Sequence, residues 1–366
     1  MKHFVHDLWG KFKGNRRALF CGYILLFVAL AILPFLLSNT VGRTWVRILD
    51  FALIYAMLAL GLNIVVGFAG LLDLGYIAFY AVGAYTWALL ASPQFDLHLP
   101  FWAILPIGAG MAALFGVLLG APTLRLRGDY LAIVTLGFGE IIRIFLNNLD
   151  HPVNVTNGPI GINKIDPISI GGADLTKTHE LLGISLSGVH IYYYVLLVLL
   201  FMTVVICVRL EKSRIGRAWL AIREDELAAQ AMGINTRNVK LLAFALGAMF
   251  GGIAGGLFAS LQGFVSPESF GLLESIMVLC MVVLGGMGHV YGVLLGAILL
   301  TVLPEILRST ASPIQQTLFG DVYIDPEALR MLLFGLALIL VMLIRPTGLW
   351  PAPKRRTTTK PDIAKD

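Results

Sequence analysis

Charged residues are scarce in this chain of 366 residues: they make up 13%, where a soluble globular domain has about 25%. Hydrophobic residues make up 58%. They gather in runs of about 20 residues, the length at which an α-helix crosses the hydrocarbon core of a bilayer. The composition excludes an ordinary soluble domain and predicts an all-α, polytopic helical membrane protein.

Cysteine is also rare. The chain has three, Cys21, Cys207 and Cys280, and each lies inside an apolar run. Cysteines in such places serve as small packing residues, so the sequence predicts no disulfide framework.

Motifs for chemistry are missing as well. A phosphate-binding loop needs Gly directly before Lys-Ser/Thr, but the chain's two Lys-Ser/Thr pairs follow Thr176 and Glu211. The sequence has no H-E-x-x-H motif and no cluster of cysteine and histidine. We therefore predict no catalytic residue, no metal site and no cofactor in this chain. If the protein pumps a solute, ATP is bound by a partner.

Apolar windows predict ten spans, at about 18–37, 48–68, 71–92, 100–121, 130–148, 189–209, 239–261, 272–288, 290–307 and 328–344. The first is too long for the apolar part of a signal peptide and is interpreted as a retained span. The predicted organisation is a cytoplasmic N-terminal segment (1–17), a transmembrane domain (18–345) and a cytoplasmic C-terminal tail (346–366).

Basic residues set the predicted orientation. With the N-terminus inside, the cytoplasmic segments carry 20 of the 27 Lys and Arg residues, the outer segments carry six, and one lies in a span. This bias follows the positive-inside rule and places both termini in the cytoplasm. It also accounts for the net charge of +5 without a nucleic-acid partner. A long outer loop is then expected at 149–188 and a cytoplasmic loop at 210–238.

Two glycine clusters interrupt the apolar runs. Each follows a Val-Val pair and is either a tight turn or a helix broken inside the bilayer. With ten spans, spans 2–5 and 7–10 enter the membrane from opposite sides, which predicts an inverted repeat, and interrupted helices mark the path in such transporters. The alternative is that the glycines only let helices pack closely. The candidate path residues here are Gly67, Gly70, Asp73, Gly75, Gly285, Gly286 and Gly288.

Glu140 and Arg143 are ionisable residues inside a predicted span. They are three residues apart and hence on one helical face, and charged groups at depth are costly unless paired or wet. Glu140 is thus a further candidate for the translocation path. The alternatives are an internal ion pair, or an Arg143 side chain that extends toward the outer surface near Asn147 and Asn148. Asp73 and Glu274 are similar cases at lower depth in the predicted spans.

The cytoplasmic segment 209–240 is the most charged part of the chain, with seven basic residues. Three acids, Glu224, Asp225 and Glu226, are predicted to fall in the first turn of a helix, where negative charge suits the helix dipole. Alanines follow, and Gly233 suits a left-handed stop. The pattern predicts a short helix whose small-residue face (Leu227, Ala228 and Ala231) a partner can approach closely. The alternative is a solvated loop.

The pattern Ala228-Ala229-x-x-x-Gly233 resembles the coupling loop of ABC importer permeases. The run GRAWLAIREDELAAQAMGI, with GLNIVVGFAGLLDLGYIAFYAVGAY, RLRGDYLAIVTLGFGEIIR and TNGPIGI upstream, resembles the branched-chain amino acid permeases of the LivM type. The likeness covers about residues 48–350. Leu227 departs from it, because the general loop has Glu at that position.

The resemblance implies a permease subunit that moves branched-chain amino acids inward across a bacterial inner membrane. The implied partners are a second, homologous permease subunit, two cytoplasmic ATPase subunits, a periplasmic substrate-binding protein and membrane lipid. The residues implied in coupling to the ATPase are Arg223, Glu224, Asp225, Glu226, Ala228, Ala229 and Gly233.

Three alternatives remain open on the sequence. Permeases of this broad family also carry urea or other small solutes. An ion-coupled secondary transporter could use an inverted repeat and buried acids, but it has no need of the helix at 224–233. A membrane-embedded enzyme is the weakest alternative, because no nucleophile–base pair or metal constellation is visible.

Overall fold

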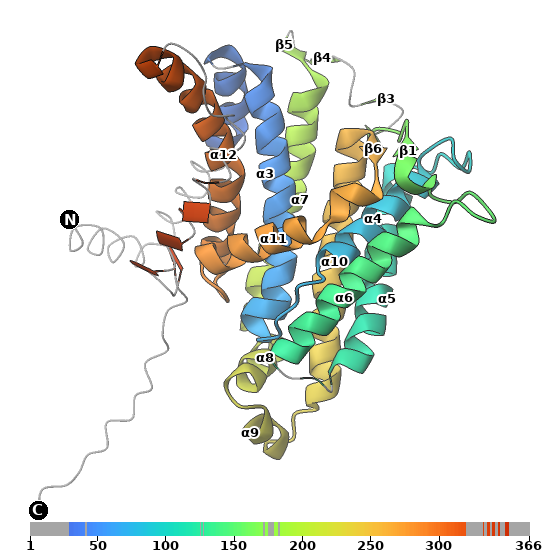
Figure 1. The fold of residues 1–366 in the computed structure, drawn as a ribbon, viewed down its shortest axis with the longest axis vertical. Coiled ribbons are helices and arrows are strands. Elements are labelled where there is room, and N and C mark those ends of the chain that lie inside the picture. The colour runs from blue at the N-terminus through green and yellow to red at the C-terminus, as the bar shows by residue number, and fades with distance from the viewer. Residues whose placement is uncertain are drawn as a thin grey trace, which may run out of the picture.

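The computed structural model describes residues 29–40, 42–124, 126, 128–170, 173–174, 179–181, 184–319, 332, 335–336, 339–340, 343–344 and 348–350. Within these residues the chain is built almost entirely of helices (Figure 1), which confirms the prediction of an all-α polytopic membrane protein. Five helical segments in the described part are long and apolar enough to cross a membrane.

A short helix covers Ala29–Thr40. The helices that follow are α3 (Arg43–Leu62), α4 (Ile77–Leu90), α5 (Phe101–Thr123), α6 (Asp129–Asn147), α7 (Gly188–Lys212), α8 (Arg214–Glu224), α9 (Glu226–Ala231), α10 (Thr236–Gln262), α11 (Leu272–Gly285) and α12 (Val290–Phe319). A π-helix, η1 (Asn63–Phe68), continues α3, and two 3₁₀ turns are η2 (Gly158–Ile160) and η3 (Pro267–Phe270).

The strands are short pairs at the end of the molecule opposite α9 (Figure 1). β1 (Ile162–Asn163) pairs antiparallel with β6 (Phe264–Val265), which ties the loop after α6 to the end of α10. The other pairs are β2 (Ser169–Ile170) with β3 (Ala173–Asp174) and β4 (His179–Leu181) with β5 (Ile184–Leu186).

Most predicted spans correspond to helices, with one clear correction. The span expected at 71–92 is not a single helix, because α4 begins only at Ile77 and 69–76 are not helical. Residues 18–28 of the predicted span 18–37 lie outside the described part of the chain. Most of the predicted span 328–344 lies outside it as well. α6 is not among the five long apolar segments.

One sequence of elements occurs twice in the described chain. A segment of 26 residues, Arg43–Phe68, precedes the non-helical stretch 69–76 and the 14-residue helix α4. Likewise the 27-residue α10 precedes the stretch 263–271, which contains β6 and η3, and the 14-residue α11. The two long segments run antiparallel, since Arg47 near the start of α3 donates to Gln262 at the end of α10 (3.2 Å). This pattern agrees with the predicted inverted repeat.

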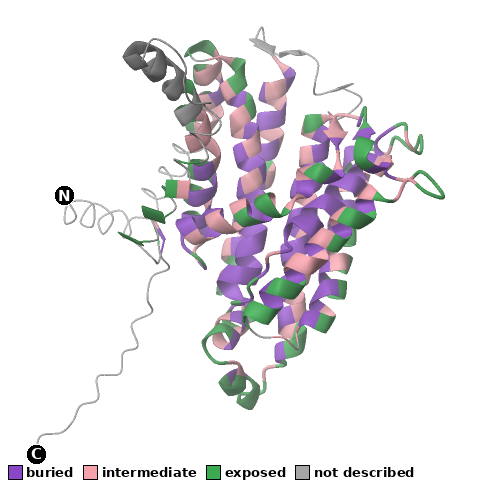
Figure 2. Cartoon of the chain, viewed as in Figure 1, coloured by how far each residue is buried: buried purple, intermediate pink, exposed green. Residues whose placement is uncertain are grey.

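The centre of the molecule is α10, which packs against α3, α4 and α5. Glycine makes the closest of these contacts possible. A Cβ at Gly83 of α4 would lie 2.1 Å from the Gly252 carbonyl oxygen of α10, and a Cβ at Gly252 would lie 2.4 Å from Cβ of Ala112 in α5. Small residues let backbones approach in this way in membrane bundles. Figure 2 shows the resulting buried interior and the exposed end formed by α9.

Candidate coupling and translocation site

The segment between α7 and α10 folds into two short helices, α8 and α9, at one end of the molecule (Figure 1). Ser213 caps α8 by accepting a hydrogen bond from the Gly216 amide (3.1 Å). Trp219 is fully buried. Its indole N–H donates to the Val239 carbonyl (2.7 Å) and its ring stacks on Phe68 at 6.5 Å between centroids. These contacts hold α8 against both α10 and η1.

Asp225 separates the two helices and caps the second. Its Oδ1 accepts hydrogen bonds from the amides of Leu227 (2.9 Å) and Ala228 (3.1 Å). The prediction that all three acids lie in one first turn was therefore wrong: Glu224 ends α8, and Glu226 alone begins α9. An aspartate is a strong N-cap because its carboxylate satisfies amides that the helix leaves free.

α9 is fastened to the start of α10 from one side. Lys240 pairs with Glu226 at 2.5 Å, and the Gln230 amide donates to the Thr236 hydroxyl (3.0 Å). Ala229 faces the same way and is 3% exposed. Its side chain therefore packs inside the chain, and the neighbouring Ala228 is the alanine left for a partner to contact.

The opposite side of α9 is exposed. Leu227 is 65% exposed and Met232 is 83% exposed, and Ala228 and Ala231 are exposed beside them. These four residues form what we call the α9 face. An apolar face on a helix that is fixed from behind is suited to docking in a groove. Gly233 ends the helix at φ +83°, as predicted.

Arg223, at the end of α8, is an exposed residue whose guanidinium reaches η1. Its Nη1 donates a hydrogen bond to the carbonyl oxygen of Gly67 in η1. The side chain also lies against the backbone of Gly70 and Gly288. A Cβ at Gly70 would lie 2.7 Å from Arg223 Cγ, and one at Gly288 would lie 3.0 Å from Nη1. Arg223 therefore joins α8 to both glycine clusters.

The two clusters touch each other through Gly67 and Gly288. A Cβ at Gly67 would lie 2.6 Å from the Gly288 nitrogen, and the Gly288 amide donates to Asn63 Oδ1 (2.8 Å). Gly286 has φ +118° and Gly288 has φ +83°, conformations that favour glycine. The second cluster is thus a short turn between α11 and α12, where Gly285 packs on Gly292.

The first cluster is a true interruption. After η1 the chain runs without helix from Ala69 to Tyr76, and Figure 1 shows this stretch passing between α3 and α4. Side chains of two neighbouring helices form hydrogen bonds with the backbone of this stretch at Leu74. Thr135 of α6 accepts from the Leu74 amide (3.0 Å), and Ser275 of α11 donates to the Leu74 carbonyl (2.5 Å). Irregular backbone at membrane depth survives only where it is satisfied in this way.

Asp73 lies fully buried in this stretch. Its Oδ1 accepts from the Gly75 amide (2.9 Å), while Oδ2 has no hydrogen-bond partner among the described residues. Gly75 is wedged against α6, since a Cβ there would lie 1.8 Å from the Thr135 carbonyl oxygen. Asp73 therefore shapes the turn into α4 with one oxygen and keeps the other unsatisfied.

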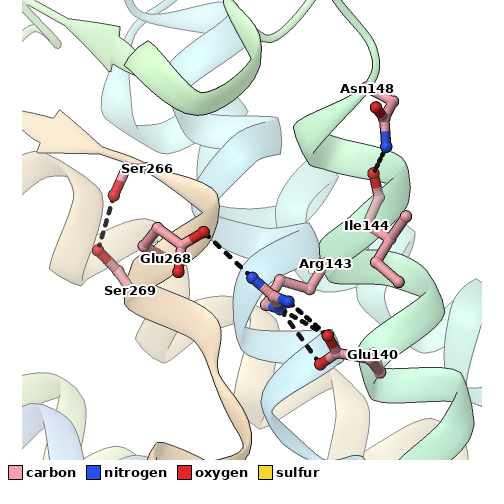
Figure 3. A network of polar contacts seen from close by, with 7 residues as sticks. All are labelled: Glu140, Arg143, Ile144, Asn148, Ser266, Glu268 and Ser269. Carbon is pink, nitrogen blue, oxygen red and sulfur yellow. Dashed lines mark hydrogen bonds and ion pairs between the residues drawn. The ribbon is translucent and has the colours of Figure 1, made fainter.

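Glu140 and Arg143 form the ion pair that their spacing allows, and a third residue joins them (Figure 3). Arg143 Nη2 lies 2.5 Å from Glu140 Oε1, and Nη1 lies 3.1 Å from Glu268 Oε1 in η3. The Glu140 side chain is 40% exposed and that of Glu268 is 70% exposed. Arg143 is thus held by two carboxylates instead of extending toward Asn148, whose amide donates to the Ile144 carbonyl.

Sequence reasoning missed several residues of these sites. Asn63 could have been identified from the sequence, because it is a lone amide inside an apolar span and lies four residues before Gly67. Thr135 and Ser275 could not have been identified in this way, since single hydroxyls are common in membrane helices. Glu268 lies 125 residues from Arg143, so no local pattern could pair them.

This fold and site define the class of protein: a polytopic helical membrane protein in which the short helix α8 contacts an interrupted span. The family described as the permease component of the branched-chain amino acid transport system matches residues 44–342, so the chain belongs to that family of transport components. It is a permease subunit of an ABC importer of the LivM type.

Individual relatives agree. The chain is 44% identical to the high-affinity branched-chain amino acid transport system permease protein LivM of Escherichia coli K12, over 93% of this chain and 78% of that protein. It is 41% identical to LivM of Salmonella typhimurium over the same shares. Identity to BraD of Pseudomonas aeruginosa is 29%, over 82% of this chain and 92% of BraD. No solved structure matches.

Proposed function

We propose that this chain carries branched-chain amino acids inward across the cytoplasmic membrane of a bacterium. It acts beside a second, homologous permease subunit, receives its substrate from a periplasmic binding protein, and is driven by two separate ATPase subunits. The match to permeases named for high-affinity branched-chain amino acid transport supports the substrate class. Both chain termini are proposed to lie in the cytoplasm.

The α9 face is the observation that carries the proposal. It exposes Leu227 and Met232, while the back of α9 is tied to α10 by the Lys240–Glu226 ion pair. A solvated loop needs neither an exposed apolar face nor a fixed back. We propose that this face sits in a groove of an ATPase subunit. When the ATPase subunit moves α8 and α9, Arg223 transmits the movement to Gly67 and Gly288.

A bulky substitution on the α9 face tests this proposal. Ala228→Trp should block seating, because a groove that fits alanine has no room for an indole. In proteoliposomes that hold the complete importer, leucine uptake should fall about tenfold or more, since about 1.4 kcal/mol of docking energy is tenfold in occupancy. Ala228→Ser is the matched control and should keep uptake within about twofold, because it adds one atom.

Uptake is measured together with the assembly of the complex. The Ala228→Trp chain should still insert and co-purify with its permease partner while it loses the ATPase subunits. Normal uptake with the ATPase subunits retained contradicts the proposed docking face. Uptake of urea or another small solute, with no uptake of leucine, would contradict the proposed substrate class and would not affect the proposal that the ATPase subunit docks on the α9 face.

A further inference from the structure

Glu274 is an acid in the first turn of α11, inside a segment apolar and long enough to cross a membrane. The Tyr55 hydroxyl donates to its Oε2 at 3.0 Å. Tyr55 stands at the middle of the 26-residue span Arg43–Phe68, so the pair lies deep in the bilayer. No ion pair joins Glu274 to a cation in the described part of the chain. An ionisable side chain at such depth marks a functional site by default.

A second, independent feature points at the same place. The Tyr80 side chain is 3% exposed, and its hydroxyl has no hydrogen-bond partner among the described residues. Tyr80 belongs to α4, which packs against α11, the helix of Glu274, and against η3. A buried hydroxyl left unpaired costs about 1–3 kcal/mol. The group of Glu274, Tyr55 and Tyr80 therefore offers one carboxylate and two hydroxyls to a partner that the chain itself does not supply.

Aromatic rings form one side of this group. The Tyr80 ring lies 5.4 Å from that of Phe258 in α10 and 5.5 Å from that of Phe270 in η3, between centroids. Phe258 and Phe270 are 6.3 Å apart and edge-to-face. The rings give Tyr80 an apolar, water-poor wall, and such surroundings strengthen an electrostatic contact.

The place in the fold agrees with a binding role. Tyr80 lies on α4 and Glu274 on α11, and these are the two 14-residue helices that follow a stretch without α-helix in each half. In transporters built from inverted repeats, substrates bind near the midplane where such interrupted helices meet.

A structural role alone explains less. An acid in a first turn stabilises its helix through the helix dipole. That role needs neither the Tyr55 hydroxyl from another helix nor the unpaired Tyr80 hydroxyl.

We propose that Glu274, with Tyr55 and Tyr80, binds the α-ammonium group of an amino acid in transit, and that the aromatic wall faces its apolar side chain. This rests on the proposed function, because it assumes that the cargo is a zwitterionic amino acid. The carboxylate supplies the charge, and the two hydroxyls complete the shell of acceptors around the ammonium.

The test uses the complete importer in proteoliposomes with radiolabelled L-leucine and its loaded binding protein. Glu274→Gln keeps a partner for Tyr55 but removes the charge. Leucine uptake should fall at least about tenfold, while ATP hydrolysis stimulated by the binding protein stays within about twofold. Glu274→Asp, which keeps the charge, should recover part of the uptake. Asp129→Asn, an exposed acid at the start of α6, is the charge-matched control and should leave both readouts unchanged.

Two results overturn the inference. Uptake by Glu274→Gln within about twofold of the unaltered importer would show that the charge is not used. A loss of uptake and hydrolysis in equal proportion, shared by Glu274→Asp, would assign Glu274 to the stability of α11. The failure of the proposed function looks different, because the unaltered importer would then not transport leucine.

Discussion

Replacing Arg223 should uncouple ATP hydrolysis from transport. The guanidinium donates to the Gly67 carbonyl and lies against Gly70 and Gly288, so it is the polar link between α8 and the interrupted span. A hydrogen bond from a charged donor contributes about 1.5–3 kcal/mol. If one conformation of the cycle keeps this bond and another breaks it, Arg223→Gln shifts their equilibrium about 10- to 150-fold.

The assay is the ratio of leucine taken up to ATP hydrolysed in proteoliposomes. Arg223→Gln should lower this ratio about tenfold or more while basal hydrolysis persists, because the α9 face is untouched. Arg217→Gln is the matched control. It lies on the same helix and carries the same charge, but the hydrogen bond that its guanidinium makes within the described residues goes to the nearby Lys212 carbonyl (3.1 Å). Its ratio should stay within about twofold.

Arg223→Lys adds a graded step. Lysine keeps the charge but lacks the planar fork, so the ratio should fall between those of the unaltered chain and Arg223→Gln. An unchanged ratio in Arg223→Gln would refute the reasoning. A ratio lowered equally by Arg217→Gln would show that net charge on α8 matters and the Gly67 contact does not.

Gly67→Ala should lower the thermal midpoint of the purified chain, at a cost of about 1–3 kcal/mol, because its Cβ would collide with Asn63 and the Gly288 backbone. Gly110→Ala is the control, since nothing lies within 4 Å of its Cβ, and an equal effect of both changes would deny the contact. The Asp166 carboxylate raises the pKa of His98, in the loop between α4 and α5. Their ion pair therefore stabilises the fold fully below the unperturbed pKa of about 6.5, and is lost as pH rises through the raised value. His98→Gln should flatten that part of a melting-versus-pH curve, and an unchanged curve would exclude the pair. A cysteine placed in 155–185 should react with an impermeant reagent from outside and one in 213–220 should not; the reverse labelling would invert the predicted topology.

The parts of the fold that depend on local pattern could be predicted from the sequence. Apolar runs gave α5, α7 and α10 to within a few residues, because burial in lipid requires nothing more than length and hydropathy. Ala228 and Gly233 likewise predicted the position and the end of α9. The run of three acids led to a wrong start for this helix. Asp225 is its N-cap and not a first-turn residue, because its carboxylate accepts hydrogen bonds from the amides of the first turn.

What could not be predicted depends on contacts across the chain. Arg223 and Gly67 are 156 residues apart, and a basic residue in a basic loop gives no sign of an inward bond. The two glycine clusters looked equivalent because both follow Val-Val. They differ in the structure, because only the first is followed by an irregular stretch held by α6 and α11. The element that corresponds to it in the second half is 263–271, which has no matching glycine pattern.

Chemical crosslinking from single cysteines on α9 is the most direct measurement of the proposed coupling. Residue 228 is exposed and residue 229 is 3% exposed, although they are neighbours in sequence. With a short bifunctional reagent and the assembled importer, Ala228→Cys should crosslink to an ATPase subunit, and Ala229→Cys should not. A crosslink from neither position, in an importer that retains its ATPase subunits and transports leucine, would contradict docking on the α9 face.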